Sequence, residues 1–243
     1  MKKKIYSINI GLLCMGILAF GTYKLMNART YQLFGEITAH VETDQKVIAL
    51  TFDDGPTKKV NELLPILDQY NAKATFFLIG QEIQKHPEEA QKIVTNGHQI
   101  GNHTFSHQRM VFISNAFIKE EIEKTDQLIQ RIGYTDAIAV RPPYGKKLIG
   151  LPNYLHKHNR ETVMWNLEPD TYYSTAEEKI KYVKDNIQPG AIILMHPMYD
   201  DTDNELQAIE GILQALTNDG YSFVTVNELK NLESKENLKK EYP

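Results

Sequence analysis

The chain has 243 residues, and 42% of them are hydrophobic, which is enough for one sizeable core and short for two. Its formal net charge of -4 and pI near 6.1 lack the basic character of a nucleic-acid-binding domain, so no nucleic-acid partner is expected. The single cysteine, Cys14, excludes an intramolecular disulfide bond and a thiolate metal cluster.

The N-terminus predicts a membrane anchor over residues 1–28. Three lysines at positions 2–4 precede an uncharged run, Ile5–Tyr23, which as a helix reaches about 28 Å, close to the thickness of the bilayer core. This order favours a single-pass protein of the cell membrane whose N-terminus is cytoplasmic and whose remainder is extracellular. A signal peptide cleaved near Ala19-Phe20-Gly21, a lipoprotein at Cys14 and a buried soluble helix are alternatives that fit less well.

The rest of the chain divides into three parts. Residues 29–46 are polar and predict an extracellular stalk, residues 47–232 predict the folded domain, and residues 233–243 form a charged tail. Seven β-rich runs in the domain are expected to be strands: Val47–Phe52, Ala74–Leu78, His98–Asn102, Ala137–Arg141, Thr162–Trp165, Ala191–Met195 and Ser222–Thr225. Helical patterns lie near residues 86–97, 117–132, 174–187 and 206–220, the third with a cap at Ser174.

The alternation of strands and helices predicts an α/β fold with parallel pairing. Many of the predicted strands are apolar throughout, as expected when helices cover both faces of a sheet. A (β/α) barrel and an open doubly wound sheet both agree with this pattern. In either fold the carboxyl ends of the strands meet at one edge, and most of the unusual polar residues follow a strand: Asp53, Asp54, His103, His107, Arg141, Glu168, Asp170 and His196.

Three of these residues form a candidate metal site. His103 and His107 are four residues apart, so both imidazoles reach one ion if the segment is helical or tightly turned. Asp54 adds a carboxylate, and three ligands leave a position open for water, as in catalytic zinc sites. Zn²⁺ is the expected ion, with Co²⁺, Ni²⁺ and Mn²⁺ as alternatives, and it would lower the pKa of a water and polarise a carbonyl. Alone, the histidine pair also fits an ordinary hydrogen-bonded pair.

The neighbouring residues suggest acid–base chemistry. Asp53 lies beside Asp54, close enough to the same water to act as general base, although Asp-Asp-Gly-Pro also occurs in ordinary turns. His196 is a candidate general acid on the opposite side. Arg141 begins a proline-stiffened loop, where its guanidinium can hold the Asp53 carboxylate ionised, and the loop can present a backbone N–H to an oxyanion.

Together these residues resemble the polysaccharide deacetylase family, also called carbohydrate esterase family 4 or the NodB-homology domain. Four of the family's five motifs match closely, in order: TFDDGP at 51–56, HTFSH at 103–107, RPPYG at 141–145 and LMH at 194–196. The resemblance covers residues 47–232 and implies a distorted (β/α)7 barrel, similar to a TIM barrel. The fourth motif departs from the family pattern, because WNLEPDTYY at 165–173 has no tryptophan after its acid.

The resemblance also implies the role of each residue. Asp53 is the general base, His196 the general acid, Arg141 the residue that orients Asp53, and Asp170 the acid that tunes His196. Tyr144 is implied to donate its backbone N–H to the oxyanion, while Leu194 and Trp165 are assigned to the substrate pocket. The implied metal ligands are Asp54, His103 and His107.

The function that the resemblance implies is metal-dependent hydrolysis of N-acetyl groups on N-acetylglucosamine-type units of a cell-surface polysaccharide. Peptidoglycan is the first expectation, and chitin-like chains or exopolysaccharide are alternatives. The expected partners are this polysaccharide and the membrane. Two other functions stay open: a wall-binding protein that has lost catalysis, and a hydrolase acting on another acyl group, such as an O-acetyl ester.

Overall fold

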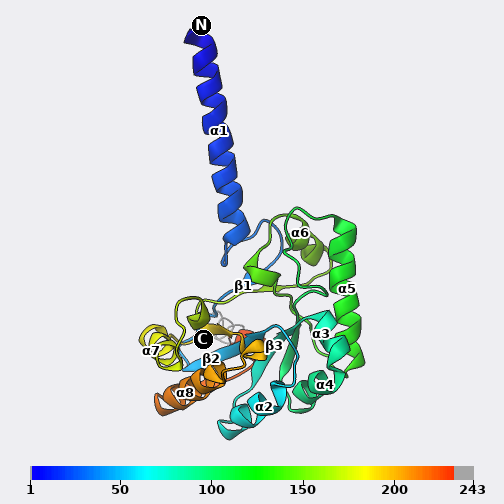
Figure 1. Ribbon diagram of the computed structural model, residues 1–243, viewed down its shortest axis with the longest axis vertical. Coiled ribbons are helices and arrows are strands. Elements are labelled where there is room, and N and C mark those ends of the chain that lie inside the picture. The colour runs from blue at the N-terminus through cyan, green and yellow to red at the C-terminus, as the bar shows by residue number, and fades with distance from the viewer. Residues whose placement is uncertain (1, 233–243) are drawn as a thin grey trace, which may run out of the picture.

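The N-terminal helix projects away from the folded domain. The computed structural model describes residues 2–232, and the expected tail at 233–243 lies outside them. Helix α1 (Lys2–Asn27) extends from one end of the domain (Figure 1). Its segment Ile10–Asn27 has a mean hydropathy of 1.4 and is not buried in the protein, so it has the length and composition to cross a membrane, as both an anchor and a signal sequence have.

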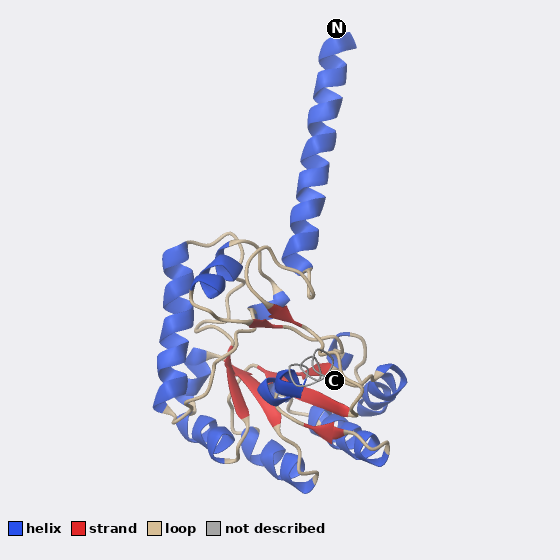
Figure 2. Cartoon of the chain, turned by 180° about the vertical axis from the view of Figure 1, so that it is seen from behind, coloured by secondary structure: helices blue, strands red, loops and turns tan. Residues whose placement is uncertain are grey.

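A parallel five-stranded sheet forms the centre of the domain (Figure 2). Strand β2 (Val47–Asp53) lies between β3 (Ala74–Leu78) and β6 (Ile192–Met195), and all seven of its residues are buried. Strand β4 (Gln99–Asn102) pairs with β3, and β7 (Ser222–Phe223) pairs with the start of β2. The predicted α/β class and parallel pairing are confirmed.

A second sheet has two short parallel strands, β1 (Ile37–Thr38) and β5 (Thr162–Val163). The strand expected at 137–141 is wrong, because only Val140 pairs there, through single bridges to β4 and β5. Two prolines follow this segment directly, and proline has no N–H to continue a ladder. A further bridge joins Leu167 to β6. Regular pairing therefore stops short of a continuous closed barrel.

The segment expected to be a stalk packs against the domain. Strand β1 lies within residues 29–46, Val41 is completely buried, and its N–H donates to the Gly190 carbonyl at 3.0 Å. Gly190 has φ +78°, and a Cβ added there would lie 1.7 Å from the carbonyl oxygen of Val41. Residues 37–41 therefore belong to the folded unit, because their apolar side chains complete its core.

Helices surround the sheet, as Figures 1 and 2 show. The expected helices are present with shifted ends, and their cap residues explain the starts. Ser114 accepts from the Phe117 N–H at the start of α5, and Thr175 accepts from the Glu178 N–H at the start of α7, one residue after the predicted cap Ser174. The helices of the domain are α2 (Val60–Gln69), α3 (Gly80–Lys85), α4 (Pro87–Thr95), α5 (Asn115–Arg131), α6 (Gly150–Lys157), α7 (Ala176–Asn186) and α8 (Asn204–Asn218).

Gly190→Ala is expected to lower the free energy of unfolding by about 3 kcal/mol, because it adds a backbone clash to an unfavourable φ. Gly133→Ala is the matched control: its φ is +94°, but an added Cβ would meet nothing within 4 Å, so about 1 kcal/mol is expected. Urea unfolding of the full chain in detergent measures both. Equal losses would show that the Val41 segment is not packed against Gly190.

Candidate active site

All ten predicted site residues meet at the carboxyl ends of the parallel strands. A cleft of about 470 Å³ opens there. Eight of the ten line it: Asp53, Asp54, His103, His107, Tyr144, Trp165, Leu194 and His196. The other two, Arg141 and Asp170, lie directly behind this lining and contact Asp53 and His196.

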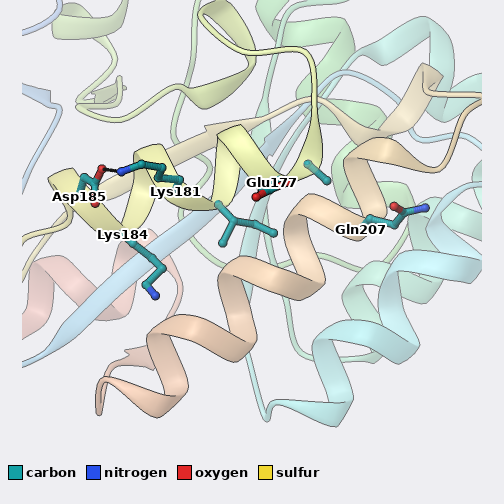
Figure 3. Close-up of a pocket in the computed structure, with 7 residues that line it drawn as sticks. Glu177, Lys181, Lys184, Asp185 and Gln207 are labelled. Carbon is teal, nitrogen blue, oxygen red and sulfur yellow. Dashed lines mark hydrogen bonds and ion pairs between the residues drawn. The ribbon is translucent and has the colours of Figure 1, made fainter.

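A larger groove lies elsewhere, between α7 and α8 (Figure 3), with a volume of about 630 Å³. It holds none of the predicted site residues, and two of its charged side chains, Lys181 and Asp185, form an ion pair with each other. The convergence of titratable side chains therefore points to the smaller cleft as the candidate site.

The three predicted metal ligands face one another across a short gap. Oδ1 of Asp54 lies 3.2 Å from Nε2 of His107 and 3.7 Å from Nε2 of His103, and one ligand atom from each residue lies within 4.8 Å of the others. Asp54 Oδ1 is buried and has no hydrogen-bond partner within the described residues. His103 Nδ1 donates to the Arg141 carbonyl at 2.8 Å, which leaves its Nε2 lone pair free for an ion. These donors fit a divalent metal ion.

The segment that carries the two histidines is a tight loop. Thr104 has φ 67° and His107 has φ 58°, unfavourable values for these residue types that must be held by surrounding contacts. Glu121 of α5 supplies such contacts: its Oε2 accepts the N–H groups of Phe105 at 3.0 Å and Ser106 at 2.8 Å. The tight turn, one of the two expected geometries, thus brings both imidazoles to the same side.

Asp53 forms a buried ion pair with Arg141. Nη1 of Arg141 donates to Asp53 Oδ1 at 2.7 Å, and neither side chain is more than 4% exposed. Arg141 also donates to the hydroxyl of Thr51 and to the carbonyl oxygens of Val163 and Met164. Burial raises the pKa of Asp53, but the charge of Arg141, with His103 and His196, outweighs burial and holds the pKa below its usual value. Asp53 is therefore ionised at neutral pH.

His196, which also lines the cleft, is held by Asp170. Asp170 Oδ2 accepts the His196 backbone N–H at 2.9 Å and lies 3.2 Å from its Nδ1. Burial lowers the pKa of His196, but the hydrogen bond to Asp170 and the charges of Asp53 and Asp54 raise it to about 9. The imidazole is therefore protonated at neutral pH, and its Nε2–H is a proton donor.

The remaining predicted residues form the walls. Leu194 is 1% exposed and Trp165 is 4% exposed, so both contribute apolar surface deep in the cleft. Tyr144 has φ 58° in the Arg141 loop, and its exposed ring packs 4.7 Å from the His107 ring. A Cβ on Gly145 would lie 2.9 Å from the Trp165 ring, so glycine lets this loop approach the indole closely.

Four further residues support the site without having been predicted for it. Lys179 is buried, forms an ion pair with Glu205, and lies 3.4 Å from Asp170. Burial, with the nearby Asp170, raises the pKa of Glu205 to about 7. A lysine one turn before buried Val183 on α7 was a detectable signal, because charge is unusual on a core-facing stripe. The sequence indicates for Glu168 only that it follows a strand, and no sequence pattern points to Arg29.

Comparisons with known proteins identify relatives of this chain. The family model described as polysaccharide deacetylase matches residues 40–163. The peptidoglycan-N-acetylmuramic acid deacetylase PdaC of Bacillus subtilis is 32% identical over 202 residues, which are 82% of this chain and 42% of that protein. A peptidoglycan-N-acetylglucosamine deacetylase of Bacillus cereus is 32% identical over 199 residues, 80% of this chain and 93% of the relative.

The fold is also similar to that of solved structures. The crystal structure of the Bc1960 peptidoglycan N-acetylglucosamine deacetylase superposes with a TM-score of 0.75 at 30% sequence identity, and the match covers 79% of this chain and 91% of that one. Sequence, fold and the arrangement of the cleft residues point the same way. The chain belongs to the polysaccharide deacetylase family.

Proposed function

We propose that this protein hydrolyses N-acetyl groups on N-acetylglucosamine-type units of a cell-surface polysaccharide, with peptidoglycan as the substrate, and releases acetate. The observation that carries the proposal is the cleft itself. An ionised carboxylate, a metal-binding triad and a protonated imidazole face one space. The relatives named for peptidoglycan support the choice of polymer.

A divalent ion, proposed to be Zn²⁺, would be held by Asp54, His103 and His107, and would polarise the acetyl carbonyl and lower the pKa of a water. Asp53 takes the proton from the attacking water, and Arg141 keeps its carboxylate ionised and oriented. The Tyr144 backbone N–H donates to the oxyanion. His196 protonates the departing amine, and Asp170 holds the imidazole in place.

The proposed architecture follows from the same arrangement. Single bridges at Val140 and Leu167 connect the two sheets, and they support the proposal of a distorted seven-stranded barrel. Helix α1 is proposed to be an uncleaved single-pass anchor, so that the catalytic domain lies outside the cell. The domain proposed at 47–232 then includes residues 37–41 as well, because they pack into its core.

Acetate release from the full chain in detergent is expected to depend on a metal ion. Chelation should abolish release from peptidoglycan and from N-acetylglucosamine oligomers, and Zn²⁺ should restore it, because Asp54, His103 and His107 offer their ligand atoms to one ion. O-acetylated chains provide a parallel test of ester hydrolysis. Metal binding without acetate release from any polymer would favour a wall-binding protein instead.

Asp53→Asn should lower kcat by roughly 10²- to 10⁴-fold while metal affinity stays close to that of the unmodified protein, because general-base catalysis contributes about that factor. Isothermal titration with Zn²⁺ and an acetate assay separate the two effects. Asp219→Asn, at the exposed end of α8, is the matched control and should leave both unchanged. Near-normal turnover in the Asp53 variant would show that another group takes the proton.

Asp170→Asn should lower the pKa of His196 from about 9 toward its ordinary value, because the hydrogen-bonded carboxylate is lost. Imidazole NMR of the metal-free chain measures this shift. A raised histidine pKa stabilises the fold fully below pH 6.5, and this stabilisation is lost as the pH rises through about 9. The variant should lose that contribution to stability. As the pH is raised, its activity should also begin to fall at a lower pH than that of the unmodified protein. An unchanged titration would show that Asp170 does not set the charge of His196.

A further inference from the structure

The segment that follows α1 is fastened to the loop beside the active site. The Lys147 backbone N–H donates to the carbonyl oxygen of Met26 at 3.3 Å, and its buried ammonium donates to the carbonyl oxygens of Ala28 and Tyr31. Lys147 comes two residues after the Arg141 loop at 141–145. These contacts place the first residues after the apolar helix at the rim of the cleft.

Arg29 extends from this segment into the cleft wall. Its Nη2 donates to Glu168 Oε2 at 2.7 Å, and its guanidinium lies 4.6 Å from the centre of the Trp165 ring. The same Glu168 oxygen accepts the Trp165 indole N–H at 2.8 Å. The Arg29 side chain is 38% exposed, whereas that of Glu168 is 12% exposed. The positive charge therefore faces the open cleft, and its counter-ion lies beneath it.

No other arginine or lysine lines the cleft within residues 2–232. The carboxylates that line the cleft are Asp53, Asp54 and Glu168, and Arg29 is more exposed than its ion-pair partner Glu168. A guanidinium presents a fork of N–H donors that matches the two oxygens of a carboxylate. Only the Nη2 group of Arg29 is engaged by Glu168, which leaves other donors available to a ligand.

We propose that Arg29 determines substrate specificity by binding a carboxylate that the glycan carries next to the sugar being deacetylated. This inference rests on the proposed deacetylase function and deepens it. In peptidoglycan such a carboxylate has two sources, the lactyl group of a peptide-free muramic acid unit and the stem peptide. The segment after α1 would then serve as one wall of the substrate-binding cleft as well as a connection to the anchor.

The test compares the full zinc-loaded chain in detergent with its Arg29→Ala and Arg29→Lys variants. Three substrates are used: peptide-free glycan strands with free lactyl carboxylates, the same strands with these carboxylates converted to methyl amides, and strands that keep their stem peptides. Arg29→Ala should raise KM about tenfold, with little change in kcat, on the strands that carry the recognised carboxylate, either the free lactyl group or the stem peptide. It should not change KM on the amidated strands. Arg29→Lys should recover part of the loss. Arg131→Ala, an exposed arginine at the end of α5, is the matched control.

The proposal would be overturned if Arg29→Ala changed KM equally on charged and amidated strands, which would indicate a purely structural role for Arg29. It would also be overturned if the substitution changed KM on neither. Failure of the proposed function looks different, because the unmodified chain would release no acetate from any strand. In that case the role of Arg29 is tested by measuring how tightly the strands bind to the chain. Trp165 is the only tryptophan in the chain, so its fluorescence reports on ligands in the cleft. Arg29→Ala should weaken binding of the recognised strands about tenfold and leave binding of the amidated strands unchanged; any other pattern overturns the proposal.

Discussion

The buried ion pair between Asp53 and Arg141 is the interaction on which the rest of the site depends. Two charges removed from water destabilise a fold unless their hydrogen bonds are satisfied. Arg141 satisfies its own with Asp53, Thr51 and two carbonyl oxygens of the β5 segment, and its guanidinium lies 4.0 Å from the centre of the Phe77 ring. The pair therefore connects β2, β3, the proline-stiffened loop and β5, and it fixes the edge at which the other side chains meet.

Around this pair the environment shifts the pKa values of two titratable groups in opposite directions, down for Asp53 and up for His196. Asp53 is kept ionised by Arg141, and His196 is kept protonated by Asp170, so one group can accept a proton while the other can donate one at the same pH. Asp170 in turn lies beside the buried Lys179, which also contacts Glu205. A chain of charged side chains thus runs from the cleft to α7 and α8, which explains why polar groups occur inside an otherwise apolar interface.

The site also depends on backbone strain at its loops. Asp54, Thr104, His107 and Tyr144 all have positive φ values, which are unfavourable for residues other than glycine. Glu121 holds the histidine loop in this conformation, because its carboxylate accepts the N–H groups of Phe105 and Ser106. This strain is concentrated where the proposed metal ligands and the proposed oxyanion donor face the cleft.

The amino-acid sequence by itself determined the α/β class, the parallel sheet and the identity of the residues that meet in the cleft. Apolar runs predict buried strands, and parallel strands bring the residues that follow them to one edge, so Asp53, His103 and His196 could be placed together without coordinates. The sequence also indicated the apolar helix, because nineteen uncharged residues are a local property.

Tertiary structure alone decided the features that depend on contacts between distant segments. Residues 37–41 lie in a stretch, 29–46, that is polar and mixed as a whole, yet they pair with β5 and bury Val41. Of the predicted strand at 137–141, only Val140 pairs, through one bridge to β4 and one to β5. Arg29 acquires its position in the cleft through Glu168, 139 residues away. No local sequence pattern specifies these contacts. They stabilise the protein only when folding brings both partners together and removes them from water.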